Sequence, residues 1–321
     1  MQIGLRLPQT GKNQATKLNI IHLARQAENA GFHSLWVLER LLWPINPRNP
    51  YPGTKDGKFP DDWQYVFDPL EILSFVAANT SRIALGTSVM DMLFHNPVIL
   101  ARRFATLDVF SQGRAICGLG IGWSEDEYKV SGITFTDRGK RAEEYIQVLR
   151  RIWTDDIVKF KGEYYDIPAS KIGPKPVQIP HIPIYLGGYS QRTFTRIAKY
   201  ANGWICTIHD SLDQINLNIK RIKEECHKAN RDPKEVGIAA ILYPNVTESD
   251  YMENNDRQGH GNHRQSSRKL LTGNIDQVGN DLLQVKKIGV DHIIFNYNRS
   301  SVSNNIDGII DISKRLWAFI R

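Results

Sequence analysis

A chain of 321 residues with 41 % apolar and 23 % charged residues has the composition of a globular protein with a sizeable core, as one large or two small domains. The formal charge of +7 raises nucleic acid as a partner, but the basic residues are spread over amphipathic segments such as 220–225, which favours a solvated surface open to an anionic cofactor. No apolar run approaches the roughly 18 residues of a membrane helix, and no signal peptide is visible, so we expect a cytoplasmic protein without membrane contact. Cys117, Cys206 and Cys226 lack C-x-x-C spacing, so we expect reduced thiols.

Short apolar segments alternate with segments of helical periodicity along the whole chain. The strands are expected at Ile3–Leu7, Ser34–Leu38, Arg82–Val89, Arg114–Leu119, Ile184–Leu186, Gly203–Thr207, Val236–Leu242 and His292–Phe295. The helices between them are expected from Ile20 to Gly31, Pro69–Asn79, Val98–Phe110, from Asp137 past Ile152, Ser190–Tyr200, Leu212–Ala229, Ile275–Lys287 and from Ile309 to Ile320. Eight strand–helix repeats predict an α/β fold, a closed (β/α)₈ TIM barrel forming one domain over residues 1–321, with an open doubly wound sheet as the alternative.

Three segments interrupt the alternation. Residues 41–68 hold five prolines and predict a long ordered loop, residues 155–181 contain a small hairpin over Ile157–Ile167, and residues 245–268 are polar with few aliphatic side chains. We expect all three at the C-terminal face of the strands, where loops over the barrel mouth select the substrate.

The segment Ile184–Ser190 combines a short strand, two glycines and a serine at a helix start. Glycines let the backbone turn and approach a ligand closely, and a helix N-terminus offers unpaired N–H groups and partial positive charge. The segment therefore predicts either a phosphate site or a plain strand–turn–helix corner.

The other strand ends favour neither a metal nor a dinucleotide. The acidic and histidine residues there (Glu39, Asp91, His95, His209 and Asp210) fall on different strands, and His260 and His263 lie in the polar insertion, so we expect no metal site. Gly118-Leu-Gly-Ile-Gly122 departs from the G-x-G-x-x-G fingerprint, and we expect the next helix only well downstream.

Several stretches together carry a family resemblance. They are Ala30–Val37, Thr80–Thr87, Ala101–Gly113, Leu119–Trp123, Gly173–Gln178, Pro183–Ser190 and Asp291–Phe295. In this order they resemble the luciferase-like monooxygenase family of flavin- and F420-dependent barrels.

The resemblance implies a cofactor site at the barrel mouth. The phosphate would lie at Gly187, Gly188, Tyr189 and Ser190. The ring would lie against the end of the third strand, at Thr87, Ser88 and Val89, where many relatives have a cis peptide bond, here Ser88–Val89. Gly120, Gly122 and Trp123 would flank the ring; for Ser88 and Trp123 the alternatives are a barrel filler and a loop core residue.

One departure from the family pattern lies at the end of the second strand. Relatives that use F420 often have Asp-His there, whereas this chain has Glu39-Arg40. Arginine cannot shuttle protons at neutral pH, so Arg40 would bind an anion or stabilise a reduced ring, and Glu39 would be the acid–base group. The alternative is a plain ion pair between Glu39 and Arg40.

Three functions remain open. The first is a flavin-dependent monooxygenase that acts on a small organic substrate with reduced FMN and O₂, with a separate flavin reductase as a possible partner. The second is hydride transfer with coenzyme F420, and the third is a non-catalytic flavin-binding barrel. The family resemblance also implies a homodimer or homotetramer.

Overall fold

Eight parallel strands close into a barrel in the computed structural model, which describes residues 1–208, 211–247, 268–298, 300, 302 and 305–321. The barrel strands are β1 (Gln2–Arg6), β2 (Ser34–Val37), β3 (Ala84–Thr87), β5 (Ala115–Gly120), β8 (Ile184–Gly187), β9 (Gly203–Ile208), β10 (Gly237–Leu242) and β13 (His292–Phe295). Each strand pairs with the next in chain order, and β13 returns to β1 with Gly4 opposite Ile294. The predicted (β/α)₈ barrel is confirmed, and the open sheet is excluded.

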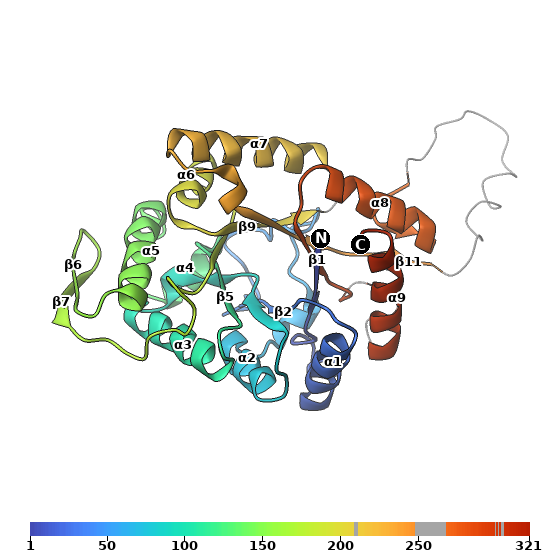
Figure 1. Ribbon diagram of the computed structural model, residues 1–321, viewed down its shortest axis with the longest axis horizontal. Coiled ribbons are helices and arrows are strands. Elements are labelled where there is room, and N and C mark those ends of the chain that lie inside the picture. Colours follow the sequence, from blue (N-terminus) through green and yellow to red (C-terminus); the bar gives the residue numbers. More distant parts are fainter. Residues whose placement is uncertain (209–210, 248–267, 299, 301, 303–304) are drawn as a thin grey trace, which may run out of the picture.

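Helices surround the strands on the outside (Figure 1). They are α1 (Lys17–Asn29), α2 (Pro69–Ala77), α3 (Pro97–Phe110), α5 (Arg138–Thr154), α6 (Gln191–Tyr200), α7 (Asp213–Lys228), α8 (Ile275–Lys287) and α9 (Ile306–Ala318). The short helix α4 (Glu125–Val130) instead follows the C-terminal end of β5, at the barrel mouth. Their starts follow local sequence: Asp68 and Asn96 cap α2 and α3 just before a proline, and Asn274 forms a capping box with Gln277 at α8.

The barrel interior is filled by a few large side chains opposite small ones. Trp36 is fully buried and packs with Ile205, Ile241 and Ile294. A Cβ on Gly86 would lie 2.5 Å from the Trp36 ring, so this position has room only for glycine. Because the interior is packed, a ligand has space only at the open C-terminal end of the strands.

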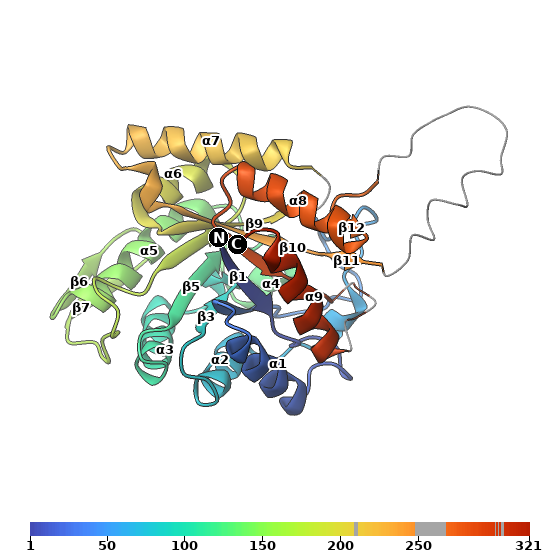
Figure 2. The same ribbon diagram turned by 45° about the vertical axis from the view of Figure 1, so that its right-hand side comes forward.

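Smaller elements are attached to the barrel. The predicted hairpin is confirmed as β6 (Val158–Lys161) and β7 (Asp166–Ser170), which project from the barrel beside α5 (Figures 1 and 2). Its expected place at the C-terminal face was wrong, because the segment joins the end of α5 to the start of β8 and so belongs to the N-terminal end of the strands. The others are β4 (Met90–Asp91), the parallel pair β11 (Asn245–Val246) and β12 (Thr272–Gly273), and the 3₁₀ turns η1 (Asp61–Gln64), η2 (Met92–Phe94) and η3 (Pro233–Glu235). Most of the predicted polar insertion, residues 248–267, lies outside the described residues.

The prediction of a distant helix after the glycine segment was wrong, because α4 begins at Glu125, directly after Trp123. Ser124 caps it and accepts a hydrogen bond from the Glu127 backbone N–H. The three cysteines, all within the described residues, are buried free thiols. No helix in the described part of the chain is long and apolar enough to cross a membrane.

Candidate active site

At the barrel mouth, glycines at the ends of β5 and β8 lie on either side of Val89. The Ser88–Val89 peptide bond is cis, as the family resemblance implied. A Cβ on Gly120 would lie 2.8 Å from one Val89 methyl group, and a Cβ on Gly187 would lie 3.2 Å from the other. Val89 therefore packs closely against both strand ends, where only glycine fits without a shift of the Val89 side chain.

The predicted phosphate segment has the expected local structure. Gly188 has a φ of +118°, which a side chain would strain, and Ser190 caps α6 by accepting a hydrogen bond of 3.2 Å from the Thr193 backbone N–H. Trp204 fixes the turn, because its indole N–H donates to the Gly188 carbonyl at 2.9 Å. The first turn of α6 thus presents backbone N–H groups on a rigid turn.

Thr87 and Tyr189, which were also predicted to bind the cofactor, connect neighbouring strands by hydrogen bonds. The buried Thr87 hydroxyl donates to the Gly118 carbonyl at 2.7 Å and accepts from the Gly118 N–H at 2.9 Å, joining β3 to β5. The Tyr189 hydroxyl accepts a hydrogen bond from the Thr207 N–H at 2.8 Å, and its ring packs edge-on against Trp204. Burial raises the pKa of Tyr189 to about 12, so its phenol stays protonated at neutral pH.

Trp123 belongs to an aromatic cluster at the rim. Its ring centroid lies 5.3 Å from that of Phe59 and 5.6 Å from that of Tyr51, both in the long loop after β2. The Arg40 guanidinium lies over the Trp123 ring at 5.3 Å and near the Trp63 ring at 5.7 Å. Residues 41–68 therefore form an aromatic wall on one side of the mouth.

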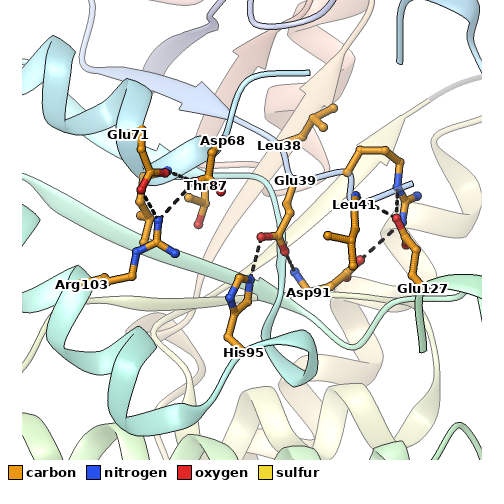
Figure 3. A network of polar contacts seen from close by, with 12 residues as sticks. Leu38, Glu39, Leu41, Asp68, Glu71, Thr87, Asp91, His95, Arg103 and Glu127 are labelled. Carbon is orange, nitrogen blue, oxygen red and sulfur yellow. Dashed lines mark hydrogen bonds and ion pairs between the residues drawn. The ribbon is translucent and has the colours of Figure 1, made fainter. Parts of the chain in front are cut away.

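Glu39 and Arg40 each have a separate partner, so the ion pair between them that the sequence left open was wrong. Glu39 accepts a hydrogen bond from the Asp91 N–H at 2.8 Å, and its other oxygen lies 2.7 Å from His95 Nε2 (Figure 3). Arg40 donates through Nε to Glu127 at 2.7 Å, and a second guanidinium nitrogen contacts the other Glu127 oxygen. The structure therefore brings together Glu39, Asp91 and His95, which the sequence placed on different elements.

Glu127 organises the start of the long loop. It is fully buried, and one of its oxygens also accepts hydrogen bonds of 2.9 Å from the N–H groups of Leu41 and Leu42. Asp91 is the second carboxylate near Arg40, with an oxygen 3.7 Å from the guanidinium. One buried cation is thus shared by two carboxylates, and Glu127 has the closer contact.

The pKa values at this rim follow from burial and these pairs. Burial raises the pKa of Asp91 to about 7, and the opposing charge of Arg40 offsets only part of this rise. Burial alone would lower the pKa of His95, but the hydrogen bond and charge of Glu39 outweigh it, so the pKa is raised. The site therefore holds groups that exchange protons near neutral pH.

Sequence reasoning missed the roles of Asp91, His95 and Glu127. The pattern Ser124-x-x-Glu127 is a capping-box signal that could have located α4 and its buried glutamate. His209 and Asp210, also considered at the strand ends, lie outside the described residues.

Strand ends without side chains and a capped helix N-terminus are features that a flat ring with a phosphate arm can use. Gly120 and Gly187 place bare backbone next to Val89, and α6 begins shortly after the end of the neighbouring strand β8. In the part of the chain that the structure describes, no group of three or more acidic, histidine or cysteine residues is placed to hold a metal ion.

Comparisons with known proteins identify the family and the fold. The family model described as luciferase-like monooxygenase matches residues 3–255. An uncharacterised protein of Mycobacterium bovis is 36 % identical over 223 residues, which cover 69 % of this chain and 78 % of that protein. An F420-dependent glucose-6-phosphate dehydrogenase of Amycolatopsis mediterranei is 33 % identical over 68 % of this chain and 62 % of its own length. Among solved structures, an F420-dependent secondary alcohol dehydrogenase in complex with an F420–acetone adduct superposes with a TM-score of 0.78 at 18 % identity, covering 100 % of this chain and 99 % of the other.

Proposed function

The chain belongs to the luciferase-like monooxygenase family, whose members are oxidoreductases or monooxygenases that use FMN or F420. From this premise we propose that it is an F420-dependent oxidoreductase that transfers a hydride between the deazaflavin and a small organic substrate. The observation that carries the proposal is the placement of Gly120 and Gly187 on either side of Val89, with the N-terminus of α6 shortly after Gly187.

Each part of the site has a task in this proposal. The α6 N-terminus, with Gly187, Gly188 and Ser190, holds the cofactor phosphate. Val89 supports one face of the ring, and Gly120 lets the ring approach the end of β5. When bound, F420 supplies the ring carbon that gives or takes the hydride.

The choice of F420 rests on a relative whose activity is named. That glucose-6-phosphate dehydrogenase is F420-dependent and 33 % identical to this chain. Arg40 replaces the histidine that many F420 enzymes have, but His95 and Asp91 bring proton-exchanging groups to the same rim from other elements.

FMN with O₂ is the second candidate, and the aromatic wall of Tyr51, Phe59 and Trp123 favours it. Oxygenation needs a site from which water is excluded, and these rings cover one side of the mouth. In this case the chain would act as a monooxygenase and would depend on a supply of reduced FMN.

Titration of the purified protein with F420 and with FMN tests the proposal. We expect F420 to bind at least about tenfold more tightly than FMN, a difference of about 1.4 kcal/mol. Gly187→Ala should weaken F420 binding by about tenfold, because the new methyl group crowds Val89 and displaces the backbone that would approach the phosphate. Gly173→Ala is the matched control, since its new Cβ meets nothing within 4 Å.

The other outcomes assign the other functions. Tight FMN binding with oxygen consumption, and no uptake of F420, would establish the monooxygenase. Binding of a cofactor without turnover by any acceptor would favour the non-catalytic barrel, and uptake of neither cofactor would refute the proposal.

A further inference from the structure

The carboxyl group of Asp91 lies beside Gly120 and Gly122, at the end of β5. One of its oxygens lies 3.1 Å from the place that a Cβ on Gly120 would take, and the other lies 3.3 Å from that place on Gly122. Val89 borders the same position on Gly120. In the proposed function the ring approaches the end of β5 at Gly120, so it would lie beside this carboxyl group.

Asp91 is not neutralised by a counter-ion of its own. Arg40, its nearest cation, is bound more closely by Glu127, and the hydrogen bond from Asp91 to Glu39 uses the backbone N–H of Asp91 and not its carboxyl. The Gly122 backbone N–H donates a hydrogen bond to the Asp91 carboxyl. The Asp91 side chain is thus held in place while its charge is only partly compensated.

The charged and titratable groups around Asp91 come from every element packed against it. Arg40 and Glu39 follow β2, His95 follows η2, and Tyr128 lies on α4 with Glu127 behind Arg40. Burial raises the pKa of Asp91, the charge of Arg40 and of a protonated His95 opposes the rise, and the charge of Glu39 adds to it. These groups together keep the carboxyl close to the midpoint of its titration at neutral pH, where a general acid–base group works best.

The other polar groups around Asp91 are less able to carry a proton. Arg40 does not release its proton at neutral pH. Glu39 already accepts hydrogen bonds with both oxygens, and the Tyr128 hydroxyl donates to the Ile121 carbonyl while burial raises its pKa. His95 also exchanges a proton, but its Nε2 is held by Glu39, and His95 is not among the nearest neighbours of Gly120 or Gly122. Among these described residues, Asp91 alone combines an exchangeable proton with a position beside the glycines at the end of β5.

We propose that Asp91 is the acid–base residue of the hydride-transfer reaction, an inference that rests on the proposed function. In the reducing direction, one atom of a substrate C=O or activated C=C bond receives a hydride from reduced F420 and its π bond breaks. Asp91 gives the proton from its carboxyl oxygen to the other atom of that bond and becomes a carboxylate beside Arg40. In the oxidising direction Asp91 takes that proton back as oxidised F420 receives the hydride.

The test compares wild type with Asp91→Asn, which keeps the shape of the side chain but has no acidic proton. In the cofactor-free protein, the infrared band of a protonated carboxyl should be present at pH 6, disappear by about pH 8.5, and be absent from the variant at both values. Oxidation of reduced F420 by menadione or 2-cyclohexen-1-one should fall by about 100-fold in the variant, with loss of the ionisation near neutral pH. The dissociation constant for F420 should change by less than about threefold.

Asp311→Asn, which removes an exposed carboxylate paired with Arg315 on α9, is the control for charge loss and should behave as wild type. An unchanged rate and pH profile in Asp91→Asn, or a carboxyl band that persists in it, would overturn the inference while F420 binding still stands. Absence of F420 binding or of turnover by the wild-type protein would instead overturn the proposed function, and the carboxyl band would then report the state of Asp91 independently.

Discussion

Replacement of Asp91 by asparagine should change how the free energy of unfolding depends on pH. In the folded protein, burial raises the pKa of Asp91 to about 7, whereas an aspartate in an unfolded chain has a pKa of about 3.9. Between these values the folded state binds one more proton here than the unfolded state. The stability that this group contributes is therefore complete below about pH 3.9 and is lost as the pH rises through 7.

His292 has the opposite effect inside the barrel. Trp36 donates a hydrogen bond of 2.6 Å to the Ser34 hydroxyl, which lies 2.7 Å from His292 Nε2. The hydroxyl that accepts from Trp36 gives its own proton to the imidazole, so the ring must be neutral at Nε2. Burial, helped by the charge of His33, lowers the pKa of His292 to about 3. The stability that His292 contributes is present above about pH 6.5 and is lost as the pH falls toward 3.

Asp91 and His292 each change the free energy of unfolding by about 1.4 kcal/mol per pH unit, in opposite directions. Their contributions therefore cancel in wild type between about pH 4.5 and 6. In Asp91→Asn only the His292 slope remains. The free energy of unfolding of the variant should therefore rise by about 2 kcal/mol relative to wild type over this interval, and His292→Gln should show a fall of similar size.

Urea denaturation followed by tryptophan fluorescence at the two pH values measures both differences, and all other titrating groups cancel in the comparison. A difference between Asp91→Asn and wild type that stays constant within about 0.5 kcal/mol would falsify the claim that Asp91 is protonated in the folded protein.

Three further predictions concern the frame of the site. Glu127→Ala should lower the free energy of unfolding by about 3–5 kcal/mol in urea denaturation, because Arg40 loses its closest partner while buried; a loss below about 1 kcal/mol would mean that the pair is solvated. Ser190→Ala removes the N-cap of α6 and should cost about 1 kcal/mol by the same assay, with weaker F420 binding in fluorescence titration; unchanged stability and affinity would contradict the capping role. Gly120→Ala places a methyl group 2.8 Å from Val89 and should lower stability by about 1–3 kcal/mol; a neutral effect would show that the strand ends are looser than described.

The barrel could be predicted from the sequence because its signals are local. Each strand is a short apolar run and each helix has a periodic apolar face, and two elements, α8 and β13, lie at the predicted residues. The cap at Ser190 was likewise readable, because a helix N-terminus depends on neighbouring residues only.

The rim network could not be read in this way, because it depends on contacts between residues far apart in the sequence. Arg40 meets Glu127, and Glu39 meets His95, 56 positions further along the chain. A charged pair next to each other in sequence suggests an ion pair, but Glu39 and Arg40 turn to different partners once the strand ends are placed. Burial of Asp91 is equally a property of the closed barrel and not of its local sequence.

The same network determines how the long loop lies over the mouth. Glu127 accepts hydrogen bonds from Leu41 and Leu42 as well as from Arg40. Further along the loop, the Arg48 backbone N–H and the Asn49 side-chain amide donate hydrogen bonds to the two acidic residues that precede Glu127 on α4. Opening of this loop would break its four hydrogen bonds to carboxylates, each worth about 1.5–3 kcal/mol, so the open form is a small minority of molecules. The aromatic wall that the loop carries is therefore in place before any ligand arrives, so substrate choice depends on the shape of a preformed rim and not on a loop that becomes ordered during binding.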